Sequence, residues 1–167
     1  MRILGIDPGY GITGFGVIEA ERGKSRLIQC GAITTPAGMD FSARLEIIYE
    51  DMRKLLEVAK PDAVAIEELF FGQNVTTGIG VAQSRGVILL AIRQAGLSVT
   101  SYKPMQVKQA VVGYGGADKK QVISMVTRIL NLPEPPKPDD TADALAIAIC
   151  HAHSGCSRLG GYYNQMQ

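Results

Sequence analysis

Hydrophobic and polar positions alternate with different periods along this chain, and the changes of period divide it into strands and helices. The first apolar run, from Arg2 to Asp7, ends in an aspartate followed by Pro-Gly, which predicts a buried strand with a carboxylate at its carboxyl end. Two more strands are expected at Phe15–Glu21 and from Leu27 to about Thr35, each after a glycine-containing turn. Strands joined by short glycine turns favour an antiparallel meander.

Apolar residues recur in steps of three and four from Phe41 to Lys60, which predicts an amphipathic helix. The next strand, Ala63–Leu69, is nearly all apolar before Glu67, as is typical of a strand buried on both faces. The order of elements predicts an α/β fold, with a mixed five-stranded sheet flanked by helices. The remaining elements are expected to be a helix from Thr76 or Thr77 to Ala95, a strand at Leu97–Tyr102, and helices at Pro104–Val111, from Asp118 to Leu130 and at Asp140–Ala152.

The composition is that of an ordinary globular protein. With 167 residues, 46% of them hydrophobic, the chain fits one domain, which we predict at residues 1–153, followed by a flexible tail at 154–167. We see no secretory signal and no membrane-spanning run, and three cysteines favour a reducing compartment, so a cytoplasmic location is predicted. The net charge of +1 does not by itself indicate a nucleic-acid partner, so charge has to be considered locally.

Four carboxylates stand at comparable positions of the predicted elements. Asp7 and Glu67 end two strands, and they meet at one sheet edge if those strands are neighbours. Asp140 and Asp143 are three residues apart in the first turn of a helix, which puts them on one face; Asp139 is expected to be the N-cap. Each acid alone is more often structural, but together they form an all-oxygen set that suits Mg²⁺ or Mn²⁺. Two such ions can clamp the attacking and leaving oxygens of a phosphodiester.

Three alternatives arise from other stretches. Asp7-Pro8-Gly9 with Thr13-Gly14 is similar to the phosphate-binding hairpin of actin-like and sugar kinases, but those proteins need two lobes and this chain has the length of one. Cys150, His151, His153 and Cys156 invite a zinc site, although their spacing is poor for tetrahedral coordination. The helix segment 87–92 is apolar all round, which fits either a central core helix or a dimer seam.

Several stretches resemble the RuvC family of bacterial Holliday-junction resolvases across residues 1 to about 153. The matching stretches are 3–9, 65–67, 83–87, 106–113 and 143–149. The resemblance implies an RNase H-like fold, a homodimer and a Mg²⁺-dependent endonuclease with one or two ions per subunit, for which Mn²⁺ substitutes. The metal-binding acids of the family fall on Asp7, Glu67, Asp140 and Asp143.

The resemblance also assigns residues to DNA. Its junction-contacting aromatic residue falls on Phe70, next to Phe71, in a loop where the rings could stack on unpaired bases. The alternative is that these rings fold back onto the core. The basic residues of the family near the scissile strand fall on Lys108 and Lys119, which we include among the catalytic residues. Further cations expected to neutralise phosphates are Lys103 and Lys120.

The function implied by the resemblance is resolution of four-way DNA junctions in homologous recombination and DNA repair. Metal-activated water would attack the phosphodiester in paired symmetric nicks, leaving 5′-phosphate and 3′-hydroxyl ends. The branch-migration proteins RuvA and RuvB would be partners. Two other classes remain open at this point: a junction-binding module that does not cut, and a nucleotide-binding protein of the kinase-like type.

Overall fold

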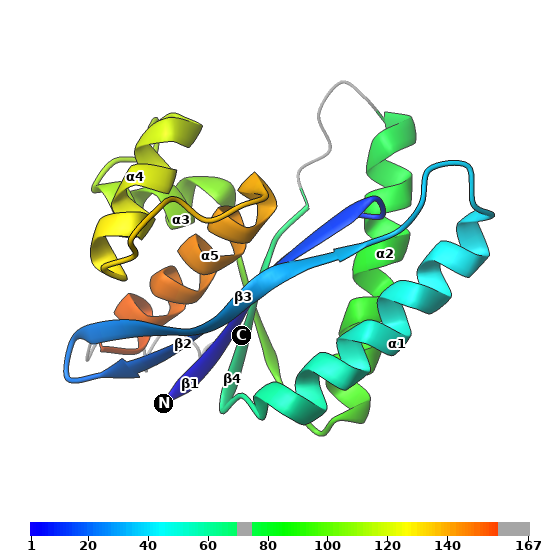
Figure 1. The fold of residues 1–167 in the computed structure, drawn as a ribbon, viewed down its shortest axis with the longest axis horizontal. Helices are drawn as coiled ribbons and strands as arrows, with labels where there is room; N and C mark the ends of the chain where they lie inside the picture. The colour runs from blue at the N-terminus through cyan, green and yellow to red at the C-terminus, as the bar shows by residue number, and fades with distance from the viewer. Residues whose placement is uncertain (70–74, 157–167) are drawn as a thin grey trace, which may run out of the picture.

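The computed structural model describes residues 1–69 and 75–156, and a mixed five-stranded sheet lies at its centre (Figure 1). The strands are β1 (Arg2–Asp7), β2 (Ile12–Glu21), β3 (Lys24–Thr34), β4 (Ala63–Glu67) and β5 (Val99–Tyr102). Their order in the sheet is β3-β2-β1-β4-β5. The first three form the predicted antiparallel meander, and β4 pairs in parallel with both β1 and β5. The predicted fold class is therefore confirmed.

The β2–β3 hairpin is longer than the apolar pattern predicts. Its register pairs Ile12 with Thr34 and Glu21 with Lys24, so only Arg22 and Gly23 form the turn. Both turn residues have positive φ, 50° and 79°, as expected for a tight hairpin connection. The ladder continues into polar, solvent-exposed positions, where side-chain hydrophobicity gives no sign of a strand.

Five helices connect or cover the strands in the described part of the chain. They are α1 (Phe41–Ala59), α2 (Val75–Gln94), α3 (Pro104–Val112), α4 (Lys119–Ile129) and α5 (Asp139–Cys156). Figure 1 shows α1 and α2 on one face of the sheet and α3, α4 and α5 on the other. As predicted, Pro104 begins α3, and Asp118 caps α4 by accepting from the Gln121 amide at 2.8 Å. None of the helices in these residues combines the length and apolar character needed to cross a bilayer.

The two ends of α5 differ from the prediction. The helix begins at Asp139, so this residue lies in the first turn and is not the predicted N-cap. It also continues four residues beyond the expected end at Ala152, so the predicted tail begins inside the helix. Two contacts stabilise this last part of α5. The His153 ring lies 3.2 Å from the Ala110 carbonyl of α3, and the Ser154 hydroxyl donates to the Cys150 carbonyl at 2.9 Å. Residues 157–167 lie outside the described part.

Helix α5 lies directly on the backbone of β1 and β2. A Cβ added at Gly5 would come within 2.1 Å of the Ala144 carbonyl oxygen, and one at Gly14 within 2.0 Å of the Asp140 carbonyl oxygen. The facing helix residues Ala144 and Ala148 are fully buried. Glycines in the strands and alanines in the helix thus bring the first turn of α5 close to the end of β1.

The opposite face of the sheet is packed with larger side chains. Ile6, Ile48, Met52 and Ile88 are fully buried between the sheet and the helices α1 and α2. The core-helix interpretation of α2 is therefore confirmed for Ile88 and its buried neighbours.

Candidate active site at the carboxyl ends of the central strands

Asp7 and Glu67 end neighbouring parallel strands, as the sequence predicted. The register pairs Ile6 of β1 with Ile66 of β4, and each carboxylate is the next residue after that pair. Both side chains are half-buried, whereas Glu68 is exposed. The alternation of side chains along β4 therefore turns Glu67, and not Glu68, toward this edge of the core.

Helix α5 brings Asp140 and Asp143 to the same edge from above the sheet. Asp140 lies in the first turn of α5 and Asp143 one turn further on, and both are half-buried, while the side chain of Asp139 is 61% exposed. Burial is the main cause of the raised pKa of Asp7, and the charges of Asp143 and Asp140 add to it, so both are close enough to act on that carboxyl. The structure therefore brings together the four predicted acids, and it distinguishes Asp140 from its neighbour Asp139.

Burial and mutual repulsion keep these carboxyl groups from ionising easily. Burial, with the charges of Glu67, Asp143 and Asp140, raises the pKa of Asp7 to about 8. Burial, with the charge of Asp143, raises the pKa of Glu67 to about 6, and burial also raises the pKa of Asp143. Asp7 thus holds a proton at neutral pH unless a cation takes its place.

Two of the predicted lysines converge on the acids. Lys119, the first residue of α4, places its Nζ 3.0 Å from Oδ2 of Asp143 and 3.6 Å from Oδ2 of Asp139. Lys108, on α3, partly offsets the rise in the pKa of Glu67 that burial causes, and it lines a cavity of about 230 Å³ together with Glu67, Asp143 and Lys119. Negative and positive groups therefore face a common small space.

The other predicted DNA-binding residues are not gathered there. Lys103 lines a different hollow, on another face of α3, and Lys120 is exposed beside Lys119. Phe70 and Phe71 lie outside the described residues.

The acids fit a hard divalent cation by their chemistry, since every donor is a carboxylate oxygen and the repulsion among these carboxylates helps to raise the pKa of Asp7. Within residues 1–69 and 75–156, however, no three Asp, Glu, His or Cys side chains are already arranged to hold a metal ion. One of the acids, Asp143, is instead paired with Lys119, whose Nζ lies 3.0 Å from its Oδ2. Binding a cation there requires Asp143 to exchange partners.

The zinc alternative finds no support among the described side chains. The ring of His151 contacts the Tyr102 hydroxyl at 3.0 Å, whereas His153 contacts a backbone carbonyl of α3. The Cys150 thiol is buried, and burial raises its pKa to about 11, which disfavours the thiolate that zinc needs.

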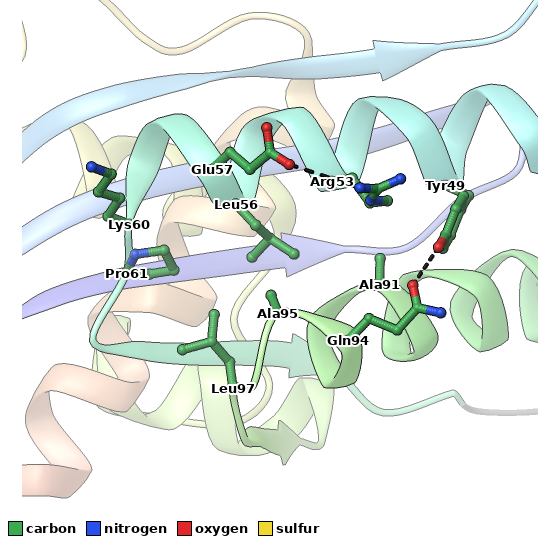
Figure 2. A pocket seen from close by; sticks show the side chains of 10 residues that line it. All are labelled: Tyr49, Arg53, Leu56, Glu57, Lys60, Pro61, Ala91, Gln94, Ala95 and Leu97. Atoms are coloured by element: carbon green, nitrogen blue, oxygen red, sulfur yellow. Dashed lines mark hydrogen bonds and ion pairs between the residues drawn. The ribbon is translucent and has the colours of Figure 1, made fainter.

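A larger hollow, of about 870 Å³, lies away from the acids, between α1 and α2 (Figure 2). There the Tyr49 hydroxyl donates to the Gln94 side chain, and Arg53 pairs with Glu57 at 3.9 Å. Pro61, which also lines it, precedes β4, whereas Glu67 ends that strand. The hollow therefore lies near the beginning of β4, at the opposite end of that strand from Glu67, and it has no part in the candidate site.

Two residues of α2 contact the strand ends, and sequence reasoning missed this role. Ser84 donates a hydrogen bond to a backbone carbonyl in the turn after β1, and Arg85 donates one to the carbonyl of the last residue of β4. The available signal was a run of three polar residues, 83–85, in the middle of the helix, but its partners depend on tertiary packing that periodicity does not reveal.

Comparison with known proteins adds to this geometry. A sequence model of the family described as crossover junction endodeoxyribonuclease RuvC matches residues 3–151. The chain is 56% identical to the crossover junction endodeoxyribonuclease RuvC of Chloroflexus aurantiacus over 154 residues, which cover 92% of this chain and 94% of that protein.

Solved structures agree with these matches. The fold is similar to Thermus thermophilus RuvC, with a TM-score of 0.86 and 39% identity over 96% of this chain and 97% of that one. It is also similar to T. thermophilus RuvC in complex with Holliday junction substrate, with a TM-score of 0.85 and 37% identity over 93% and 95% of the two chains.

Proposed function

This chain belongs to the RuvC family of crossover junction endodeoxyribonucleases, and on that premise we propose how its residues act on DNA. It has an RNase H-like fold and is a structure-selective endonuclease of four-way (Holliday) junctions. The observation that carries the proposal is the meeting of acids and lysines at one sheet edge. Asp7 and Glu67 arrive there from β1 and β4, Asp143 from α5, and Lys108 and Lys119 from α3 and α4.

We propose that the four acids hold one or two Mg²⁺ ions, for which Mn²⁺ can substitute. The all-oxygen donor set and the raised pKa of Asp7 support this, because a bound cation compensates the charge that burial makes costly. When bound, the ions supply Lewis-acid activation of water and stabilise the leaving oxygen of the phosphodiester.

The side chains of the site then have two further roles, which are to position the scissile phosphate and to stabilise its charge. Asp7 and Glu67 are fixed by the strand register, so they set the position of the scissile phosphate relative to the sheet edge. Lys119 is paired with Asp143, and its ammonium group would be free to face the scissile phosphate where Asp143 served as a metal ligand. Lys108 is the second cation of the cavity and stabilises charge that develops on the phosphate oxygens. The products would carry 5′-phosphate and 3′-hydroxyl ends.

DNA contacts outside the cavity are proposed for two groups of residues. Phe70 and Phe71 stand three and four residues after the end of β4 in the sequence and would stack on unpaired bases at the junction centre. Lys103 and Lys120 are exposed and would neutralise phosphates further from the scissile bond.

A homodimer explains the surface of α2. Four of its exposed positions follow steps of four, three and four, which form one stripe along the helix. Ile79 and Leu90 are 53% and 50% exposed, and a Cβ added at Gly86 would contact nothing within 4 Å. The stripe comprises Ile79, Gln83, Gly86 and Leu90.

We propose that two copies meet along this stripe about a two-fold axis. The dimer would present two sites to the two-fold symmetry of a four-way junction and would place paired symmetric nicks. The RuvA and RuvB branch-migration complex is proposed as a further partner on the basis of family membership.

The proposal is tested by cleavage of a labelled mobile four-way junction against linear duplex of the same sequence, with Mg²⁺ or with EDTA. Wild-type protein should nick only the junction, symmetrically and only with the metal. Asp7→Asn and Glu67→Gln should lose cleavage while junction binding persists. Glu68→Gln is the matched control, because its exposed carboxylate neighbours Glu67 and points away, and it should cut normally.

The same assay separates the adjacent acids of α5. Asp140→Asn should abolish cleavage, whereas Asp139→Asn, on an exposed side chain, should keep it. Tight junction binding with no cutting in any divalent metal would contradict the nuclease mechanism and leave a junction-binding module.

A further inference from the structure

The part of α2 that resembles the family stretch 83–87 contains two adjacent polar residues that take no part in the chemistry described above. Ser84 is fully buried, and its hydroxyl donates to the Gly9 carbonyl at 3.0 Å. Arg85 is half-buried, and its Nε donates to the Glu67 carbonyl at 3.2 Å. Consecutive residues of one helical turn thus bond to backbone at the ends of two neighbouring strands.

Each of these contacts is part of a larger set of hydrogen bonds. The Gly9 carbonyl also accepts from the buried Thr13 hydroxyl at 2.6 Å, so the turn after Asp7 is held from two sides. The other arm of the guanidinium, Nη2 of Arg85, donates to the Ser101 hydroxyl of β5 at 2.8 Å. The planar fork of arginine therefore spans the ends of β4 and β5 at once.

These contacts matter because of what the strand ends carry. Asp7 lies two residues before Gly9, and Glu67 is itself the residue whose carbonyl accepts from Arg85. The two carboxylates repel one another across the β1–β4 pair. Strand ends have fewer ladder hydrogen bonds than strand centres, so this repulsion acts where the sheet is least constrained.

We propose that Ser84 and Arg85 are positioning residues that fix the spacing between Asp7 and Glu67 by bonding the backbone of both strand ends to α2. This inference rests on the proposed function of the two acids. Neither side chain touches the reacting atoms. Groups that orient ligands from behind in this way typically change metal affinity or activity by about 10–100-fold when removed.

The central test uses Arg85→Lys, which keeps the positive charge and the aliphatic stem but loses the fork that reaches two acceptors. Mn²⁺ affinity is measured by titration calorimetry without DNA, junction affinity in EDTA, cleavage under single-turnover conditions, and stability by thermal unfolding. We expect Mn²⁺ affinity and the cleavage rate to fall about tenfold or more, with junction affinity unchanged and cleavage partly restored by excess Mn²⁺. Arg93→Lys, at an exposed position further along the same helix, is the matched control and should match wild type.

Two milder variants keep the test valid if Arg85→Lys folds poorly. Ser101→Ala removes only the outer anchor of the guanidinium, and Ser84→Ala removes only the bond to Gly9. Each should weaken Mn²⁺ binding by less than Arg85→Lys does, with a wild-type unfolding midpoint. The double variant Ser101→Ala/Arg85→Lys should bind Mn²⁺ only slightly more weakly than Arg85→Lys alone, because both substitutions break the same connection between α2 and β5.

Wild-type Mn²⁺ affinity and cleavage in all three variants would overturn the inference while leaving the nuclease proposal intact. Loss of junction binding in EDTA with unchanged Mn²⁺ affinity would also overturn it, since Arg85 would then be a DNA contact. A wild-type protein that does not cut junctions would instead refute the proposed function, and the Mn²⁺ titration would still decide whether the two strand ends are positioned by α2.

Discussion

The two faces of the sheet are packed by different means. On the face covered by α5, helix backbone meets strand backbone, and the gap at Gly5 and Gly14 leaves no room for a single methyl group. On the face covered by α1 and α2, the contact is made by large aliphatic side chains such as Ile48 and Met52.

The two kinds of packing differ in how closely they fix the position of a helix on the sheet. Side chains have alternative rotamers and can repack, whereas two backbones in contact have one separation. The acids that must converge, Asp140 and Asp143, are on the helix whose position is set by backbone contact. The face without catalytic acids relies on ordinary side-chain packing.

Adding one methyl group on the sheet face covered by α5 should have the largest effect on stability. Gly5→Ala places its Cβ 2.1 Å from the Ala144 carbonyl oxygen, so α5 must move. We expect a loss of at least about 3 kcal/mol in the free energy of unfolding, measured by denaturant titration. The control is Gly116→Ala, whose Cβ would meet only the Tyr114 ring at 3.8 Å. A Gly5→Ala protein as stable as the control would show that the helix is not held by backbone contact.

The charges on this face should make the metal-free protein less stable at high pH. The pKa of Asp7 rises from 3.8 to about 8 on folding, so its contribution is most favourable below pH 3.8 and is lost as pH rises through about 8. Asp7→Asn removes this cost, so at pH 9 in EDTA the variant should be more stable than wild type by a few kcal/mol, and about equal near pH 4. Thermal unfolding at both pH values measures this, and equal midpoints at pH 9 would contradict it.

Removing one methyl group from the opposite face should have a modest effect. Ile48→Val shortens a fully buried side chain of α1 and should cost about 0.5–1.5 kcal/mol of unfolding free energy. Val58→Ala, on the same helix but 71% exposed, should be close to neutral. A cost for Ile48→Val as large as that for Gly5→Ala would remove the contrast between the two faces.

The smallest expected effect is a shift in the pH dependence of cleavage. Lys119 lowers the pKa values of Asp143, Asp7 and Glu67, so Lys119→Gln lets these acids keep their protons to higher pH. The acid limb of the pH–rate profile should move upward by less than about one unit. Lys120→Gln removes an exposed neighbouring charge and should leave the limb in place. A downward shift for Lys119→Gln would contradict the assigned ion pair.

The sequence was informative where chemistry follows from local pattern. Apolar runs and turn residues predicted the sheet, and parallel pairing of β1 with β4 was enough to bring Asp7 and Glu67 together. The spacing of Asp140 and Asp143 predicted a shared helix face, although the helix starts one residue earlier than expected.

The remaining features depend on contacts between distant segments. Glycine inside a strand signals close approach, so Gly5 and Gly14 could have been noticed, but nothing local identifies α5 as the neighbour. The hydrogen bonds of Arg85 depend in the same way on where α2 lies against the strand ends. Lys103 was grouped with Lys108 as a cation of the same part of the sequence, but the two line different hollows because they lie on different faces of α3.

The most direct test of the metal-site claim is calorimetric titration of Mn²⁺ into the DNA-free protein at pH 7, repeated in buffers of different ionisation enthalpy. Because Asp7 has a pKa of about 8, cation binding should release about one proton at pH 7 and much less at pH 9. Asp7→Asn should abolish most of the proton release and weaken binding. Tight Mn²⁺ binding that releases no proton at pH 7 and is unchanged in Asp7→Asn would show that the buried carboxylate is not the metal ligand.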